Sequence, residues 1–206
     1  MKQFNGYDNA KKIAQSSGGA KLPKGAYVAK ILGVKYKEGE NGNSDQIIVQ
    51  FDITEGEYAG FFKKAFDAST AEDKKYKGQT SVWVPKDDGT EQDGWTKTAF
   101  ARWTNSLEES NSDYHWDWDE KKWKDKAIGL VFGEVGTVIE GKEVVYTAVD
   151  HPEPVANIKS GDFREAKFKA RNGYTGKGTT ANNGSTSASG NFMSIPDDID
   201  EELPFN

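Results

Sequence analysis

Apolar residues recur at every second position in several short segments of the chain, and this alternation constrains the fold more than any other feature. Within residues 46–53, the apolar side chains of Ile47, Val49, Phe51 and Ile53 fall on one face of an extended strand. Comparable segments, bounded by glycine, proline or polar turn residues, span residues 26–34, 61–66, 80–84, 127–135 and 143–149. Residues 96–109 instead place their apolar side chains at helical spacing. The pattern predicts a mainly β fold with five or six strands and one inserted helix, arranged as a closed or partly open barrel or as a mixed sheet.

Low-complexity sequence separates this region from the C-terminus. Of residues 172–193, 16 of 22 are Gly, Ser, Thr or Asn, a composition that buries too little apolar surface to offset the entropy of ordering the chain. The sequence therefore predicts four parts. They are an N-terminal arm (residues 1–21), a folded domain (22–170), a flexible linker (171–193) and a tip (194–206), so that the C-terminal tail is expected to be disordered.

Composition excludes several classes of function. The chain has no cysteine and two histidines, which excludes disulfides and thiolate zinc sites and leaves few groups for acid–base catalysis. His115, Asp117 and Asp119 alternate as metal ligands can, but no second histidine lies near them, and we expect Trp116 and Trp118 to be core residues. The prediction is a protein that is not an enzyme and needs no cofactor or metal. A metal-dependent nuclease is the enzymatic alternative.

Charge is unevenly distributed along the chain. The formal net charge is -6, but residues 1–80 carry 13 basic and 10 acidic side chains, whereas residues 170–206 carry 2 and 5. No stretch is apolar for the roughly 18 to 20 residues that a membrane span requires, and residues 1–12 contain no apolar run typical of a secretory signal. We therefore expect a cytoplasmic protein without a membrane partner.

The last 13 residues combine a cluster of carboxylates with an apolar end. Five carboxylates precede Leu203, Pro204 and Phe205 at the end of the predicted linker. Charge would steer such a segment to a basic surface, and the Phe205 ring would anchor it in a small pocket. A purely solubilising acidic tail is the alternative. The predicted partner-binding residues are Asp197, Asp198, Asp200, Glu201, Glu202, Leu203, Pro204 and Phe205.

Residues 197–205, DDIDEELPF, resemble the C-terminal tip of bacterial-type single-stranded DNA-binding proteins. Those proteins carry an OB-fold, a low-complexity linker and an acidic tip that recruits replication and repair proteins. In addition, residues 22–27 and 51–60 resemble bacteriophage proteins regarded as single-stranded DNA-binding proteins. The family tip ends on Phe, whereas here Asn206 follows Phe205. The resemblance implies an OB-like barrel that binds single-stranded DNA, in the cytoplasm of an infected bacterial cell.

Proteins that bind single strands without sequence preference stack bases on aromatic rings beside cations that contact the phosphates. Rings and lysines adjoin in two segments of the predicted domain, and Trp83 could also face outward, although a position in the core is an equally good explanation for each single ring. The candidate DNA-binding residues are Lys35, Tyr36, Lys37, Phe61, Phe62, Lys63, Lys64 and Trp83.

Two functions follow from these observations. The first is a phage protein that coats single-stranded DNA during replication or recombination and recruits partner proteins through its acidic tip, with oligomers possible. The alternative is a replisome adaptor that binds protein partners and does not contact nucleic acid, which the net negative charge favours.

Overall fold

The computed structural model describes residues 21–40, 42–70 and 72–176. The predicted N-terminal arm up to residue 20, the linker from residue 177 and the acidic tip lie outside the described residues. The elements are β1 (Gly25–Lys37), β2 (Gln46–Ile53), α2 (Phe61–Ala68), β3 (Gln79–Trp83), α3 (Glu91–Ser110), the 3-10 turn η1 (Glu120–Trp123), β4 (Ala127–Ile139), β5 (Lys142–Glu153), α4 (Val155–Ser160) and β6 (Lys169–Ala170). The prediction of a mainly β fold is confirmed.

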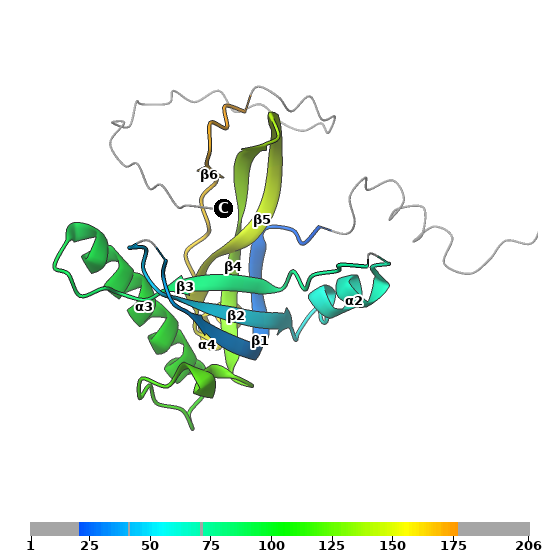
Figure 1. Cartoon of the computed structure of the whole chain (residues 1–206). Helices are drawn as coiled ribbons and strands as arrows, with labels where there is room; N and C mark the ends of the chain where they lie inside the picture. Colours follow the sequence, from blue (N-terminus) through cyan, green and yellow to red (C-terminus); the bar gives the residue numbers. More distant parts are fainter. Residues whose placement is uncertain (1–20, 41, 71, 177–206) are drawn as a thin grey trace, which may run out of the picture.

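The six strands form one open mixed sheet in the order β3-β2-β1-β4-β5, with β6 paired to β4. Neighbouring strands are antiparallel except for β6, which runs parallel to β4. Among the described strands, β3 and β5 do not pair, so the sheet does not close into a complete barrel. α3 contacts β3, β4 and β5, and thereby covers the core between the two edge strands. Figure 1 shows the long β4–β5 hairpin projecting from this body with β6 beside it.

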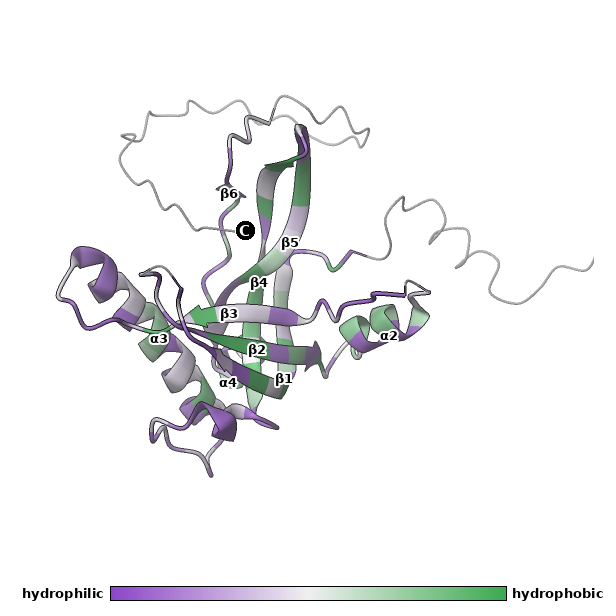
Figure 2. Cartoon of the chain, in the orientation of Figure 1, coloured by the Kyte–Doolittle hydropathy of each residue, from purple (hydrophilic) through white to green (hydrophobic). Residues whose placement is uncertain are grey.

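The strand register assigns one face of the sheet to the core. Ala29 and Ile31 of β1 lie opposite Ile53 and Phe51 of β2, and all four side chains are buried. A bulge between Ile31 and Gly33 shifts the alternation by one residue, so that core-facing positions continue at Val34. Figure 2 shows the hydrophobic residues concentrated in these central strands, whereas the N-terminal part of α3 is hydrophilic.

Large aromatic rings form two groups within the core. Phe51, Phe62 and Phe132 meet beneath the sheet, with Phe51 and Phe62 edge to face at 5.4 Å between ring centroids. In the second group, Trp103 of α3 stacks on Trp123 of η1, with 6.2 Å between the ring centroids. Aromatic pairs in these geometries contribute about 0.5–1.5 kcal/mol beyond the area that they bury. The high aromatic content of the chain is thus used largely for packing.

The predicted strand at residues 61–66 is wrong, because this segment forms helix α2. The pattern is ambiguous, since rings at 62 and 66 are also spaced one helical turn apart. Asp52, a buried residue of β2, decides in favour of the helix. Its carboxylate accepts hydrogen bonds from the backbone N–H groups of Phe62 and Lys63 at 3.0 Å each, which satisfies two donors in the first turn. The expectation of a single helix is also wrong, since α2 and α4 accompany α3.

The predicted helix at residues 96–109 is confirmed and begins earlier, at Glu91. The Thr90 side chain accepts a hydrogen bond from Asp93 N at 3.2 Å and caps the N-terminus. In the described part of the chain, no helix has the length and apolarity needed to cross a membrane.

Candidate nucleic-acid interface

The face of β1, β2 and β3 opposite to the core carries three of the predicted DNA-binding residues. Cross-strand pairing aligns Lys37 with Gln46 and Gln46 with Trp83, so these three side chains form one row across the sheet. The next rows along the strands are Lys35, Ile48 and Ser81, and then Gly33, Gln50 and Gln79. We call these nine residues the outer array.

The outer array combines lysines, one aromatic ring and amide side chains on one surface. It contains two lysines and no carboxylate, and both lysines are exposed. Trp83 and Ile48 are half-buried and lie outside the hydrophobic core, so their apolar surfaces face away from it. The remaining side chains are mostly amides, which both donate and accept hydrogen bonds. The array therefore places one aromatic ring of β3 on the same face as two cations of β1 that can contact phosphates.

Tyr36 lies on the other side of β1 from the outer array. It pairs with the buried Ile47, and its ring is 42% exposed at the end of the strand. The Tyr36 hydroxyl donates a hydrogen bond to the carboxylate of Asp45, which also accepts from Gly39 N at 2.7 Å. The bond to Asp45 raises the pKa of Tyr36 to about 12. This residue consequently orders the β1–β2 loop and does not share a surface with Trp83.

Of the four candidates in α2, the two rings pack against neighbouring aromatic side chains, and the two lysines make surface contacts within or next to the helix. Phe62 is buried against Phe51, and Phe61 is half-buried. Lys63 Nζ lies 2.7 Å from a carboxylate oxygen of Asp67, and Lys64 Nζ donates to Ala59 O at 2.7 Å. The structure thus brings together Lys35, Lys37 and Trp83, but not the α2 residues.

The polar members of the outer array were missed by sequence reasoning. Gln46, Gln50, Gln79 and Ser81 join the lysines only through the pairing of β2 with both neighbours. The alternation of apolar and polar residues in β2 could have identified the outward-facing positions, because the residues between Ile47, Val49 and Phe51 must face away from the core. Their cross-strand partners depend on a register that alternation does not specify.

The aromatic segment after α3 follows the expectation in part. Trp116 is half-buried and packs against Trp123 at 5.5 Å between ring centroids, as predicted for a core residue. Trp118 is 82% exposed, so its predicted core position is wrong. The Trp118 backbone has a φ of 67°, an unusual conformation for a bulky residue. The chain is therefore not extended at this residue, and its side chains do not alternate between two faces as they would in a strand.

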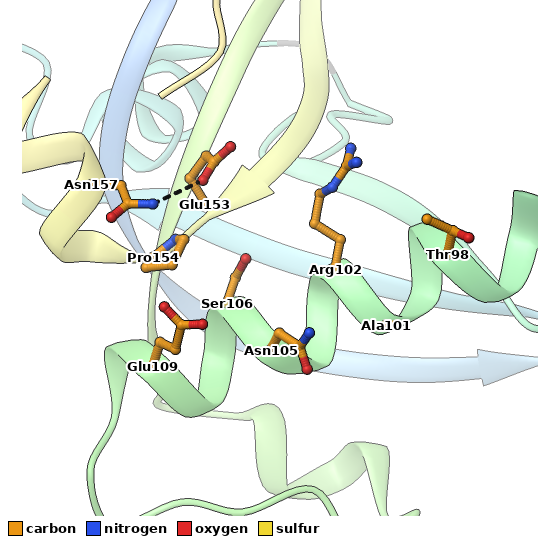
Figure 3. Close-up of a pocket in the computed structure, with 9 residues that line it drawn as sticks. All are labelled: Thr98, Ala101, Arg102, Asn105, Ser106, Glu109, Glu153, Pro154 and Asn157. Atoms are coloured by element: carbon orange, nitrogen blue, oxygen red, sulfur yellow. Dashed lines mark hydrogen bonds between the residues drawn. The ribbon is translucent and has the colours of Figure 1, made fainter. Parts of the chain in front are cut away.

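A pocket of about 470 Å³ lies on another side of the molecule, between α3 and the connection from β5 to α4. Figure 3 shows Arg102, Asn105 and Glu109 on α3, with Glu153 and Asn157 on the opposite side and joined by a hydrogen bond of 3.3 Å. The lining contains one cation and two carboxylates. This charge balance does not favour a polyanion, and the outer array is the better candidate interface.

Comparison with known proteins adds no assignment. The chain matches no protein-family model. A search of curated proteins likewise finds no match.

Proposed function

We propose that this protein binds single-stranded DNA without strong sequence preference and that the outer array is the contact surface. The observation that carries the proposal is the placement of Trp83, Lys35 and Lys37 on one face of the sheet, within an array of nine residues that contains no carboxylate. A base can stack on the indole while its flanking phosphates contact the lysines. Stacking on an aromatic side chain contributes roughly 1–3 kcal/mol per base and requires no particular base.

The strand connectivity supports an OB-like fold as the finer description of the domain. β1 pairs with both β2 and β4, and α3 connects β3 to β4 across the open side of the sheet. An OB-fold is a five-stranded Greek-key barrel that is partly open and binds oligonucleotides on the face of its second and third strands. The outer array lies on β1, β2 and β3, which agrees with that location.

The biological role that we propose is the protection of single strands during replication or recombination of a phage genome in an infected bacterial cell. In this role the residues 197–205 recruit partner proteins, and the linker separates them from the DNA-binding domain. The protein would act without a cofactor and would catalyse no bond breakage.

Binding of a labelled thymidine oligonucleotide, followed by fluorescence anisotropy at several salt concentrations, tests the proposal. We expect measurable affinity that falls as salt rises. Lys35→Ala combined with Lys37→Ala should reduce the slope of log affinity against log salt by about 1.4, because each lost phosphate contact on a single strand contributes about 0.7. Trp83→Ala should weaken binding by about 1–3 kcal/mol.

Trp95→Ala is the matched control, since Trp95 is an exposed tryptophan of α3 outside the outer array. It should bind as the unmodified protein does. Absence of binding by the unmodified protein at any salt concentration contradicts the proposal and favours the adaptor function.

A further inference from the structure

A basic and aromatic segment of the C-terminal region lies along the β4–β5 hairpin. We call residues 163–174, with the sequence FREAKFKARNGY, the C-terminal strap. It contains four cations and one carboxylate, together with three aromatic rings. Figure 1 shows this part of the chain, which includes β6, running beside the hairpin.

Glycines of β4 allow the strap to approach the hairpin backbone closely. A Cβ atom added at Gly133 would lie 2.7 Å from the Ala166 Cβ, and one added at Gly136 would lie 2.7 Å from atoms of both Phe168 and Tyr174. Cβ atoms essentially never lie this close to another heavy atom, so a side chain at either position would displace its neighbours in the strap. The backbone of the strap is held as well, because Arg171 N donates to Gly136 O at 2.8 Å.

Asp150 of β5 anchors the strap by charge. Its carboxylate lies 2.8 Å from Lys169 Nζ and 3.8 Å from a guanidinium nitrogen of Arg164. A β-bulge opposite Val131 and Phe132 leaves Asp150 without a cross-strand partner, and the Nδ1 of the following His151 lies 2.6 Å from the Asp150 carboxylate. The hydrogen bond with His151 and then that with Lys169 hold the pKa of Asp150 well below its ordinary range, so the anchor stays charged at neutral pH.

Two cations and one aromatic ring of the strap, namely Lys167, Arg171 and Phe168, do not contact the anchor Asp150. Lys167 is exposed and Arg171 is half-buried, and neither forms an ion pair with another described residue. Phe168 is 49% exposed and lies 5.5 Å from the Tyr174 ring, measured between centroids. Since Lys169 and Arg164 lie against Asp150, Lys167 and Arg171 are the strap cations that no described carboxylate pairs with.

We propose that the C-terminal strap is a second contact for single-stranded nucleic acid, in which Lys167 and Arg171 bind phosphates and Phe168 stacks on a base. This inference rests on the proposed function of the outer array. Measured along β1 from Lys35 to Gly25 and along β4 from Phe132 to Gly136, the two surfaces are separated by about 45 Å of strand. A long single strand can therefore reach both surfaces, whereas a short one occupies one of them.

The test compares the unmodified protein with three variants on thymidine oligonucleotides of about 6 and about 25 residues, one within and one beyond the range of about 4–16 nucleotides typical of a single OB fold. The variants are Lys167→Ala combined with Arg171→Ala, the single change Phe168→Ala, and the control Lys121→Ala combined with Lys124→Ala. The control removes two exposed lysines near η1, away from the hairpin. Thermal unfolding of each variant checks that the fold is retained.

On the longer oligonucleotide, the strap variant with two cations removed should lose about 1.4 from the slope of log affinity against log salt. Phe168→Ala should weaken binding of the longer oligonucleotide about fivefold or more. On the short oligonucleotide, the affinities of the strap variants and of the unmodified protein should differ less, because this oligonucleotide can bind the outer array alone. The control variant should match the unmodified protein.

Other outcomes separate this inference from the proposed function. If the unmodified protein binds and the strap variants match it on both lengths, the strap inference is overturned while the outer array remains. The inference is overturned too if the strap variants retain DNA binding but lose affinity for a synthetic peptide of residues 194–206, since the strap would then receive an acidic protein segment. If no oligonucleotide binds the unmodified protein, the proposed function fails first.

Discussion

The buried carboxylate of Asp52 in β2 stabilises the first turn of helix α2, which follows it in the chain. It accepts hydrogen bonds from Phe62 N, Lys63 N and Ile53 N, the last at 2.9 Å. Asp52→Ala leaves these donors without a partner, so we expect a loss of about 1–3 kcal/mol in the free energy of unfolding, measured with urea. The control Asp67→Ala removes only the exposed ion pair with Lys63 and should change stability by less than about 1 kcal/mol. Equal effects of the two changes would contradict the capping role.

The hydrogen bond between Tyr36 and Asp45 has a defined pH dependence. Because the pKa of Tyr36 rises from about 10 to about 12 on folding, the bond stabilises the chain fully below pH 10 and its contribution is lost as the pH rises towards 12. The same bond lowers the pKa of Asp45, so the contribution of that carboxylate disappears at acidic pH, as it is protonated.

Asp45→Ala should return the pKa of Tyr36 towards 10, as measured by nuclear magnetic resonance of the labelled ring. Asp67→Ala is a suitable control, since that carboxylate pairs with Lys63. An unchanged Tyr36 pKa in the Asp45 variant would show that another group causes the shift.

Strand β4 depends on glycines for its packing against the C-terminal elements. A Cβ atom at Gly129 would lie 2.4 Å from Ile158 Cγ1 of α4 and 2.6 Å from the backbone oxygen of Glu153. Gly129→Ala should therefore destabilise the protein by about 1–3 kcal/mol, because the neighbouring backbone cannot move aside cheaply.

In α3, a Cβ atom added at Gly94 would have no neighbouring atom within 4 Å. Gly94→Ala should stabilise the helix by about 0.5–1 kcal/mol. Chemical denaturation measures both, and effects of the same sign would contradict this account.

The distribution of charge along the complete chain predicts competition between the acidic tip and DNA for basic surfaces. Deleting residues 194–206, which contain five carboxylates, should raise the affinity for a single strand at low salt. The difference should shrink as salt screens the charges, since the Debye length is only about 10 Å at 0.1 M. Deleting residues 181–193 is the matched control, because that segment has the same length and no charged side chain. Unchanged or lower affinity after removal of the tip argues against competition.

Alternation of side chains located most of the sheet in advance. The predicted strands at 26–34, 46–53, 127–135 and 143–149 lie within β1, β2, β4 and β5, because a strand with one buried face requires this period. Residues 61–66 carry a pattern compatible with both a strand and a helix, and the choice required a carboxylate from β2. Of the candidate DNA-binding residues, Lys35, Lys37 and Trp83 lie on one face of the sheet, whereas Tyr36 and the α2 residues lie elsewhere.

Local sequence was sufficient for β1, β2, β4 and β5 and for most of α3, since each depends on periodicity over a few residues, and the low-complexity composition of residues 172–193 is likewise a property of the sequence. The grouping of Trp83 with Lys35 and Lys37 depends on the register of β1, β2 and β3, which is set by contacts between distant parts of the chain. The position of the C-terminal strap depends likewise on the glycines of β4 and on Asp150. Such contacts form only when the chain folds, because a surface is buried only when a second segment covers it. The free energy of burial therefore depends on which two segments meet and in which register, and the sequence of either segment alone does not specify this.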